Sequence, residues 1–252
     1  MMERIDWSKR FELSTLIKET KMKKTKLKVI TVAVCLMLSA IVANGAEDKV
    51  VLEGAKVGQW TMDYAAALAE AKKSELPVLL NFTGSDWCGW CKIMDKNVFS
   101  KKEWQEYAAK NMMLVTLDFP KDKSIVPEKY VSRNDKLSLE FGVEGYPTYI
   151  VLDYDGQTRL GQLGAGREKT GGSFIGEVKS ALKTSQNSLK AYAIAHPDKI
   201  EAFKATIQAL KSNKKALDDW IQTRPSVNPE NKTKYANFLE DIKTSEEALS
   251  KF

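Results

Sequence analysis

The chain has 252 residues, of which 43% are hydrophobic and 29% are charged, and these values are ordinary for a globular protein. Its formal net charge is +6, but nine of the 39 basic and four of the 33 acidic side chains lie in residues 1–46. The other 30 basic and 29 acidic side chains leave residues 47–252 almost neutral. Such a body lacks the basic surface of a nucleic-acid-binding protein, so we expect no nucleic-acid partner.

Residues 1–46 have the three parts of a secretory signal segment. Five lysines between positions 21 and 28 form a basic region, and residues 29–43 are mostly apolar. Small residues follow at 43–46, where a signal peptidase would cut. The segment therefore predicts export to the periplasm or another extracytoplasmic space.

The start of this segment and its cleavage each allow more than one interpretation. We expect cleavage after Gly45 or Ala46, and the polar residues before Met22 favour Met22 as the true initiator. An uncleaved membrane anchor is the alternative to cleavage, although the apolar run falls short of the roughly 20 residues that span a bilayer. In that case the membrane would be contacted only through the N-terminal segment.

Helix and strand patterns alternate through residues 47–184. Thr61 is the expected N-cap of the first helix, and residues 112–118 form a continuous apolar run, as in a strand covered on both faces. Asp155-Gly156 predicts a hairpin turn. The predicted order is helix 62–74, strand 77–82, helix 88–98, helix 102–110, strand 112–118, surface loop 121–133, short helix 135–141, strand 147–152, strand 157–163 and helix 171–182.

The segment Trp87-Cys88-Gly89-Trp90-Cys91-Lys92 is the chemical centre of the sequence. It follows a predicted strand and opens a predicted helix, so Cys88 falls at a helix N-terminus, where unpaired backbone N–H groups favour an anion. A thiolate in this position has a pKa below the free value of about 8.5. Cys91 lies one turn further along the same face and can close a disulfide. We therefore expect Cys88 to be accessible and Cys91 to be more buried.

Two other uses of this cysteine pair are weaker. Zinc would need two further ligands, but the third cysteine, Cys35, lies in the signal segment and the one histidine, His196, lies far downstream. We therefore expect no metal at the pair. A purely structural disulfide would restrain little, because so short a loop removes little entropy from the unfolded chain.

Three features together resemble the thioredoxin-like thiol–disulfide oxidoreductases. They are the strand, the Cys88–Cys91 helix start, and Gly145-Tyr146-Pro147-Thr148 downstream, and the resemblance covers roughly residues 58–184. Phe82-Thr83-Gly84-Ser85-Asp86-Trp87 resembles exported bacterial members of the periplasmic thiol:disulfide interchange type. The resemblance implies an α/β thioredoxin fold, with a central mixed β-sheet flanked by helices, and a domain that ends near residue 184.

The resemblance also implies roles for individual residues. Cys88 matches the attacking cysteine and Cys91 the resolving cysteine, and together they match the family's redox-active disulfide. Pro147 matches the family's cis-proline, and Tyr146 beside it would offer its backbone to a bound peptide. Trp87 and Trp90 flank the thiol and are expected to contact substrate, with simple packing as their alternative role.

The chain departs from the family pattern at two places. The position of the family's buried aspartate falls on Asn81, if one inserted residue is allowed, and the position of its partner lysine falls near Leu114. Asp86 or water would then have to accept the proton of the resolving thiol. The dipeptide between the cysteines, Gly89-Trp90, carries no histidine, whereas strongly oxidising members often have one there. This absence favours a more reducing couple.

Residues 185–252 predict a C-terminal all-α extension. Helical apolar spacing covers 188–195 and 200–210, and further helices are expected near 215–223 and 232–251. We expect the apolar stripe of these helices to pack on the thioredoxin-like body, with partner docking or dimerisation as the alternative. His196 is expected at the surface between two helices.

The sequence as a whole predicts an exported oxidoreductase that exchanges disulfides with protein substrates, most often as their reductase. No bound cofactor is required, because a redox partner protein would supply the electrons. A disulfide isomerase and a redox-inert thioredoxin-like protein-binding module are the alternatives.

Overall fold

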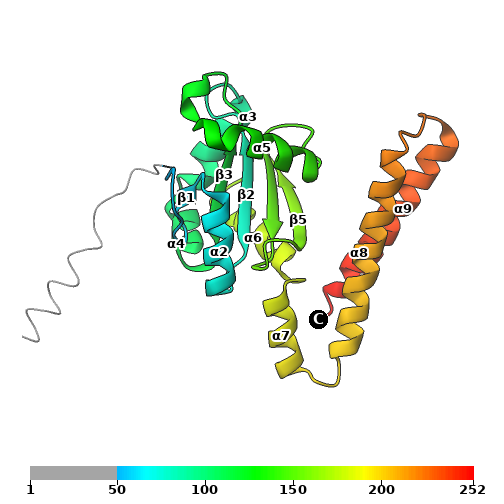
Figure 1. Cartoon of the computed structure of the whole chain (residues 1–252). Helices are drawn as coiled ribbons and strands as arrows, with labels where there is room; N and C mark the ends of the chain where they lie inside the picture. The colour runs from blue at the N-terminus through cyan, green and yellow to red at the C-terminus, as the bar shows by residue number, and fades with distance from the viewer. Residues whose placement is uncertain (1–49) are drawn as a thin grey trace, which may run out of the picture. The chain divides into compact units, whose positions relative to one another are not determined.

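The computed structural model describes residues 50–252 (Figure 1). The predictions for the signal segment, for Met22 as initiator and for Cys35 lie outside the described residues. No helix in the range 50–252 is both long enough and apolar enough to cross a membrane.

A five-stranded mixed sheet lies at the centre of the fold, in the order β1-β3-β2-β4-β5 (Figure 1). The central strands β2 and β3 run parallel to each other, and β1 adds to β3 in parallel. β4 pairs antiparallel with β2, and β5 pairs antiparallel with β4. The strands are β1 (Trp60–Thr61), β2 (Val78–Thr83), β3 (Met113–Asp118), β4 (Thr148–Leu152) and β5 (Arg159–Gly164).

Helices cover both faces of this sheet, because alternate residues of each buried strand point to opposite sides. Leu79 and Leu114 face a core completed by α3 (Gly89–Met94), the π-helical turn η2 (Asp95–Phe99), α4 (Lys102–Asn111) and α6 (Gly171–Leu182). Leu80 and Val115 face the opposite core, which α2 (Tyr64–Ser74) and α5 (Glu128–Glu140) close. All six residues of β3 are buried, as the apolar run predicted. The predicted thioredoxin fold is therefore confirmed.

The predicted surface loop over 121–133 is wrong in its second half. A short 3-10 turn, η3 (Lys123–Ile125), is followed by α5, which begins at Glu128 directly after Pro127. Proline is compatible with a helix start, because its φ is fixed near the helical value and no N–H is lost from the helix. The charged residues hid the periodicity of the buried side chains, which are Tyr130, Asn134 and Leu137.

Thr61 does not cap the first helix. Asp63 takes that position, and its side chain accepts a hydrogen bond from the Ala66 N–H at 3.0 Å. Thr61 belongs to the two-residue strand β1, which the sequence analysis missed, and its hydroxyl donates to the carbonyl oxygen of Gly54 at 2.6 Å. A strand of two residues leaves too short a pattern for periodicity to detect.

The C-terminal extension consists of three helices, α7 (Gln186–Ala195), α8 (Ile200–Gln222) and α9 (Pro229–Leu249). The two helices predicted over 200–210 and 215–223 are one continuous helix. Its apolar stripe is buried mainly within the extension rather than on the sheet, which corrects the expected packing. The cluster comprises Phe203, Ile207, Leu210 and Leu249, with Leu189, Tyr192, Ile200 and Ile242 against it.

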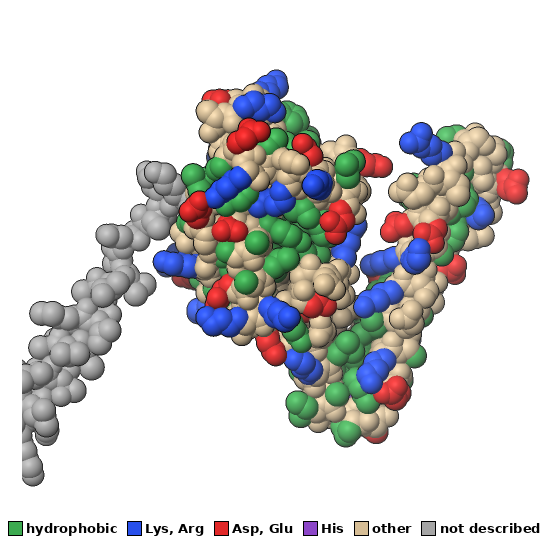
Figure 2. Space-filling view, viewed as in Figure 1, with side chains coloured by type: hydrophobic (Ala, Val, Ile, Leu, Met, Phe, Trp, Pro, Cys, Tyr) green, Lys and Arg blue, Asp and Glu red, His purple; other side chains and the backbone are tan. Residues whose placement is uncertain are grey.

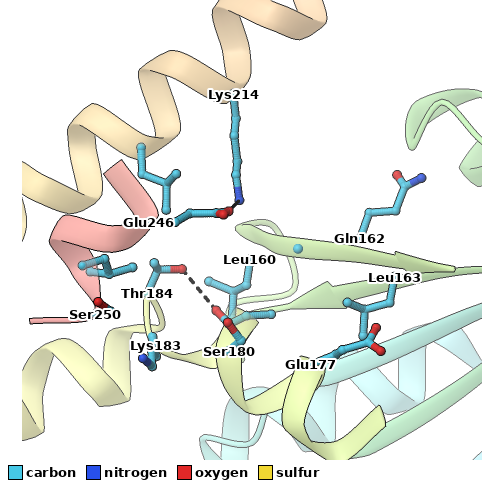
Figure 3. A pocket seen from close by; sticks show the side chains of 14 residues that line it. Leu160, Gln162, Leu163, Glu177, Ser180, Lys183, Thr184, Lys214, Glu246 and Ser250 are labelled. Carbon is cyan, nitrogen blue, oxygen red and sulfur yellow. Dashed lines mark hydrogen bonds and ion pairs between the residues drawn. The ribbon is translucent and has the colours of Figure 1, made fainter. Parts of the chain in front are cut away.

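A pocket of 340 Å³ lies where α8 and α9 approach β5 and α6 (Figure 3). Leu160 of β5 and Leu210 of α8 contribute apolar wall, and the ion pair between Lys214 and Glu246, at 2.9 Å, joins α8 to α9. His196 ends α7 at the surface, as predicted, with its ring 4.7 Å from that of Tyr192.

Basic and acidic side chains are interspersed over the face drawn in Figure 2. No broad single-sign patch covers that face of the described residues. This mixture is the surface expected from the near-neutral composition of residues 47–252.

We predict that Gly58→Ala destabilises the protein far more than Gly54→Ala. Both glycines have a positive φ, +73° and +76°, which costs an L-residue about 1–2 kcal/mol. A Cβ on Gly58 would also lie 2.3 Å from the Ala109 Cα, whereas nothing lies within 4 Å of one on Gly54. Urea unfolding of the two variants measures the difference, and equal losses of unfolding free energy would contradict the close packing of this turn on α4.

Candidate active site

A tight turn between β2 and α3 presents the cysteine pair. The carbonyl oxygen of Gly84 accepts hydrogen bonds from the backbone N–H of Trp87 at 3.2 Å and of Cys88 at 2.8 Å. Cys88 is then the N-cap of α3, as the sequence predicted. Gly84 is required in this turn, because a Cβ there would lie 2.5 Å from the Trp87 indole.

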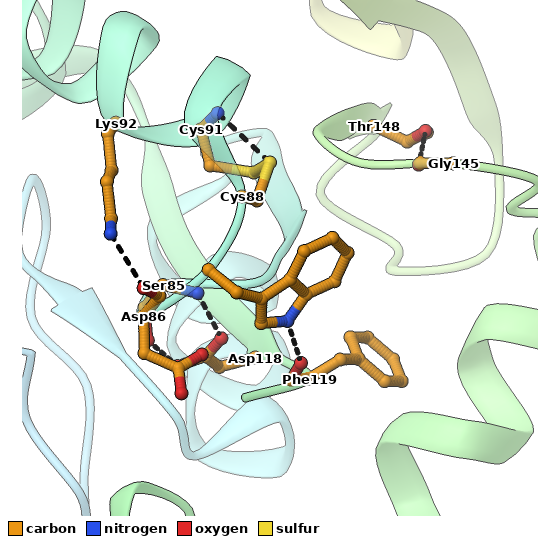
Figure 4. The surroundings of a disulfide bond; sticks show 10 residues. Ser85, Asp86, Cys88, Cys91, Lys92, Asp118, Phe119, Gly145 and Thr148 are labelled. Carbon is orange, nitrogen blue, oxygen red and sulfur yellow. Dashed lines mark hydrogen bonds between the residues drawn. A yellow bond between two sulfur atoms is a disulfide. The ribbon is translucent and has the colours of Figure 1, made fainter. Parts of the chain in front are cut away.

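Cys88 and Cys91 form a disulfide with their Cα atoms 5.3 Å apart (Figure 4). The backbone N–H of Cys91 also donates to the Cys88 Sγ at 3.1 Å. The relative exposure is 4% for Cys88 and 7% for Cys91, so in the disulfide form Cys88 is not the more accessible cysteine, contrary to the sequence-based expectation. Once the disulfide is reduced, a hydrogen bond from this backbone N–H would stabilise the Cys88 thiolate.

The loop after β3 holds this turn from below (Figure 4). The Trp87 indole N–H donates to the carbonyl oxygen of Phe119 at 2.8 Å. The Asp86 carboxylate accepts the backbone N–H groups of Lys121 and Asp122 at about 3 Å. Sequence reasoning did not predict the contacts of this loop with the turn, because they join positions more than 30 residues apart.

Asp86 does not face the cysteine pair as a base would. The Asp122 N–H, and then the Lys121 N–H, hold the pKa of the Asp86 carboxyl below its usual value. Its own carbonyl oxygen accepts the Lys92 ammonium at 2.6 Å. Because both carboxylate oxygens are engaged by the loop after β3, Asp86 is poorly placed to accept a proton from Cys91.

An open groove runs beside the disulfide. The groove has a volume of 420 Å³, and Trp90, Tyr146 and Pro147 all line it. The Tyr146–Pro147 peptide bond is cis, a state that the sequence left open. Trp87 contacts Tyr146 from outside the groove, with ring centroids 5.8 Å apart. Trp87 and Trp90 remain 42% and 44% exposed, so both leave free aromatic surface at the rim.

Arg167 contacts the groove residue Trp90, and sequence reasoning missed it. Its guanidinium lies over the Trp90 ring, 5.9 Å from the centroid. Arg167 follows β5, so the contact links the helix start to a loop about 77 positions later in the chain. No short motif marks such a contact.

Comparison with known proteins decides the family. The model of the Thioredoxin-like family matches residues 59–154. The disulfide bond reductase DsbH of Chlamydia pneumoniae is 36% identical over 126 residues, which cover 50% of this chain and 73% of that protein. The chain belongs to the thioredoxin-like family. It is a disulfide oxidoreductase of that family, with the cysteine pair described above.

Two further similar proteins differ in the share of their length that aligns with this thioredoxin-like chain. The thioredoxin-related protein DsbJ of Chlamydia pneumoniae is 28% identical over 174 residues, covering 67% of this chain and 47% of that protein. The chain thus spans about half the length of DsbJ. A solved structure of a DsbH oxidoreductase is 30% identical and covers 58% of this chain and 98% of that chain, with a TM-score of 0.47.

A pocket of 220 Å³ lies behind Cys91, and Asn81 lines it. The Asn81 Oδ1 is buried and accepts no hydrogen bond from the described residues. Thr116 lies opposite Asn81 in the β2–β3 register, whereas Leu114 lies opposite Leu79. Thr116 is therefore the register partner of Asn81, and Leu114, the position matched to the family's lysine, lies two residues away on the same face of the sheet.

Asp95 is the carboxylate on this pocket, four positions after Cys91 along the helix. Burial, and then the negative charge of Asp95, raise the pKa of Tyr149. The pocket is large enough for several waters, and the polar side chains in its wall, such as Asn81 and Thr116, offer them partners. Cys91 therefore borders a partly apolar space that is lined from the helix side by Asp95 and Lys92, while the strand side carries the neutral amide of Asn81.

We predict that Asn81→Asp introduces a new ionisation into the exchange reaction. Desolvation and the neighbouring sulfur both disfavour a charge there, so the pKa of the new carboxyl is raised and the pH–rate profile changes between about pH 6 and 9. Because the raised pKa belongs to the folded state, the variant also loses stability relative to wild type as pH rises through that pKa.

Stopped-flow exchange rates across this range and urea unfolding at pH 5 and 8 test both effects. Thr116→Val is the matched control, since it alters the same pocket without adding an ionisable group. Superimposable pH–rate profiles for wild type and Asn81→Asp would mean that Asn81 does not act on Cys91.

Proposed function

We propose that the protein is an exported protein-disulfide reductase in which Cys88 attacks and Cys91 resolves. One observation carries the proposal: the Cys88–Cys91 disulfide opens α3 beside a groove lined by Trp90, Tyr146 and Pro147. The helix start supplies the Cys91 N–H to the first sulfur, and the groove has room for an extended peptide beside it. Related DsbH carries the name of a disulfide bond reductase, which supports the same direction.

The reaction proceeds by two displacements at sulfur. The Cys88 thiolate attacks one sulfur of a substrate disulfide, forms a mixed disulfide and expels the first substrate thiolate. The Cys91 thiolate then attacks the Cys88 Sγ and expels the second substrate thiolate. The substrate has gained two electrons, and the protein holds the Cys88–Cys91 disulfide. A dithiol partner protein reduces it again by the same two steps in reverse.

Each groove residue has a stated part in this scheme. The backbone at Tyr146, before the cis-proline Pro147, is placed to pair with an extended substrate segment. Trp87 and Trp90 offer exposed aromatic surface on either side of the attacking sulfur. Their positions favour docking of unfolded or extended protein segments, whose main chain and apolar side chains are accessible.

The dipeptide Gly89-Trp90 favours the reducing direction. Neither residue carries a charge that could stabilise the Cys88 thiolate, so the reduced form gains only the Cys91 N–H bond and the helix start. For this couple about 30 mV corresponds to about 1.4 kcal/mol, so the absence of one charged partner moves the potential by tens of millivolts toward reducing values.

Wild-type protein should reduce insulin disulfides in the presence of dithiothreitol, and Cys88→Ala should abolish the catalysed rate, because no thiolate remains to attack. Cys91→Ala should instead trap protein substrates as mixed disulfides on Cys88, since the second displacement is lost. Non-reducing gels and the turbidity of precipitating insulin chains measure the two outcomes.

The same assays separate the alternative functions. Equal trapping by Cys88→Ala and Cys91→Ala would contradict the assigned roles. Recovery of scrambled ribonuclease without net insulin reduction would indicate an isomerase, and substrate binding that persists in both variants without any exchange would indicate a redox-inert docking module.

Export is the second part of the proposal, and it rests on residues 22–46. We predict that residues 22–60 carry an alkaline phosphatase reporter out of the cytosol, where its own disulfides form and it becomes active. Leu36→Arg with Leu38→Arg should abolish reporter activity, because two charges interrupt the apolar run. Equal activity with and without these charges would contradict the signal segment.

A further inference from the structure

Asp118 is a buried carboxylate that none of the assigned roles uses. It ends β3, is 4% exposed, and lies opposite Thr83, the last residue of β2. Both of its oxygens bind Ser85: Oδ1 accepts the Ser85 N–H at 2.9 Å and Oδ2 accepts the Ser85 hydroxyl at 2.6 Å. A carboxylate out of water is costly unless its lone pairs are engaged, and these two bonds engage both oxygens (Figure 4).

Asp118 is itself anchored from the other side. Its carbonyl oxygen accepts the Asn134 side-chain N–H at 3.1 Å. The Asn134 Oδ1 in turn accepts from the Arg133 guanidinium, which also donates to the carbonyl oxygen of Met62 at 2.6 Å. The backbone of Asp118 is therefore tied to α5 and, through Arg133, to the loop before α2, so the residue is held by more than its own strand.

A hydrogen bond from the Cys88 N–H to the Gly84 carbonyl oxygen closes the turn before α3. Ser85 is the first residue inside this turn. The turn residues Ser85, Asp86 and Trp87 all bind the segment 118–122, but only Ser85 binds it through a buried, charged acceptor. Hydrogen bonds to a charged group are roughly twice as strong as neutral ones. The Ser85–Asp118 contact is therefore a charge-assisted constraint on where the turn delivers Cys88, and its carboxylate is the buried one among these contacts.

We infer that Ser85 and Asp118 are positioning residues for the attacking cysteine. Their paired hydrogen bonds hold the turn so that the Cys88 Sγ stays on the Cys91 backbone N–H and faces the groove. This inference rests on the proposed function, because it concerns the sulfur assigned to attack.

Charge and geometry give opposite effects at Asp118, which makes the inference testable. The charged groups on the elements that carry or contact the cysteine pair are Asp86, Lys92, Asp95, Asp118 and, against Trp90, Arg167. If Asp118 acted only through its negative charge, removing the charge would stabilise the Cys88 thiolate and speed its alkylation. If it acts by holding the turn, removing it loosens the bond from the Cys91 N–H and slows alkylation. Ser85→Ala removes one hydrogen bond and no charge.

The experiment measures iodoacetamide alkylation of Cys88 in the reduced, signal-free chain between pH 4 and 10, with the modified peptide quantified by mass spectrometry. We expect Ser85→Ala and Asp118→Ala to slow alkylation at pH 7 by about threefold to tenfold and to move its midpoint to higher pH. Asp118→Asn keeps an acceptor for the Ser85 N–H, so its rate should equal or exceed that of wild type.

Asp155→Ala is the matched control. Asp155 holds the β4–β5 turn in the same way, accepting the Gln157 N–H and both the N–H and the hydroxyl of Thr158. Its loss should lower the melting temperature, as Asp118→Ala does, and leave the alkylation midpoint unchanged.

A wild-type midpoint in Ser85→Ala, or faster alkylation in Asp118→Ala, would overturn the inference. If Asp118→Ala does not fold, Ser85→Ala decides the result, since it removes a single oxygen. Failure of the wild-type protein to reduce insulin would contradict the proposed function, while the comparison of alkylation midpoints among the variants would still decide the role of the two residues.

Discussion

The parallel pairing of β2 with β3 is the constraint on which the site depends. Parallel strands need helices on both faces, and all of β3 and nearly all of β2 is accordingly buried. Their six register pairs bring the two carboxyl ends together, so that Thr83 and Asp118 finish side by side. The turn before Cys88 and the loop after β3 therefore leave the sheet at the same edge and hold each other.

The same pairing explains why the chemistry sits at this edge and not elsewhere. The sheet interior is apolar and offers no partner to a charge, whereas the strand ends expose backbone groups and admit polar side chains. Cys88 receives a backbone N–H at the helix start, and Cys91 borders a polar pocket between β2, β3 and the helix. The two sulfurs thus share one bond but have different surroundings, in keeping with the proposed roles of Cys88 in attack and Cys91 in resolution.

The parts of the fold that follow from local chemistry could be predicted from the sequence. The bounds of α6 follow from Thr170 and the apolar spacing after it, and β3 follows from an uninterrupted apolar run. Cys88 at a helix start follows from the motif alone. The first half of α5, residues 128–134, was missed because most of its positions are charged or polar and Pro127 suggested a loop rather than a helix start.

Contacts between distant positions could not be predicted in the same way. Nothing in the local sequence at Ser85 indicates a carboxylate 33 positions later. The residue opposite Asn81 is also set by the register of two distant strands, which pairs Asn81 with Thr116. The cis state of Pro147 likewise depends on its tertiary surroundings. Such features need the fold, because tertiary packing rather than propensity selects them.

The reduction potential of the Cys88–Cys91 couple tests the account most directly. Equilibration with glutathione buffers, followed by quantification of the reduced and oxidised forms, gives its value. An uncharged Gly89-Trp90 dipeptide and a single N–H bond to the attacking sulfur predict a potential below about −200 mV, toward the thioredoxin value of about −270 mV. A potential near −120 mV, typical of strongly oxidising members of the superfamily, would contradict the assignment of this protein as a reductase.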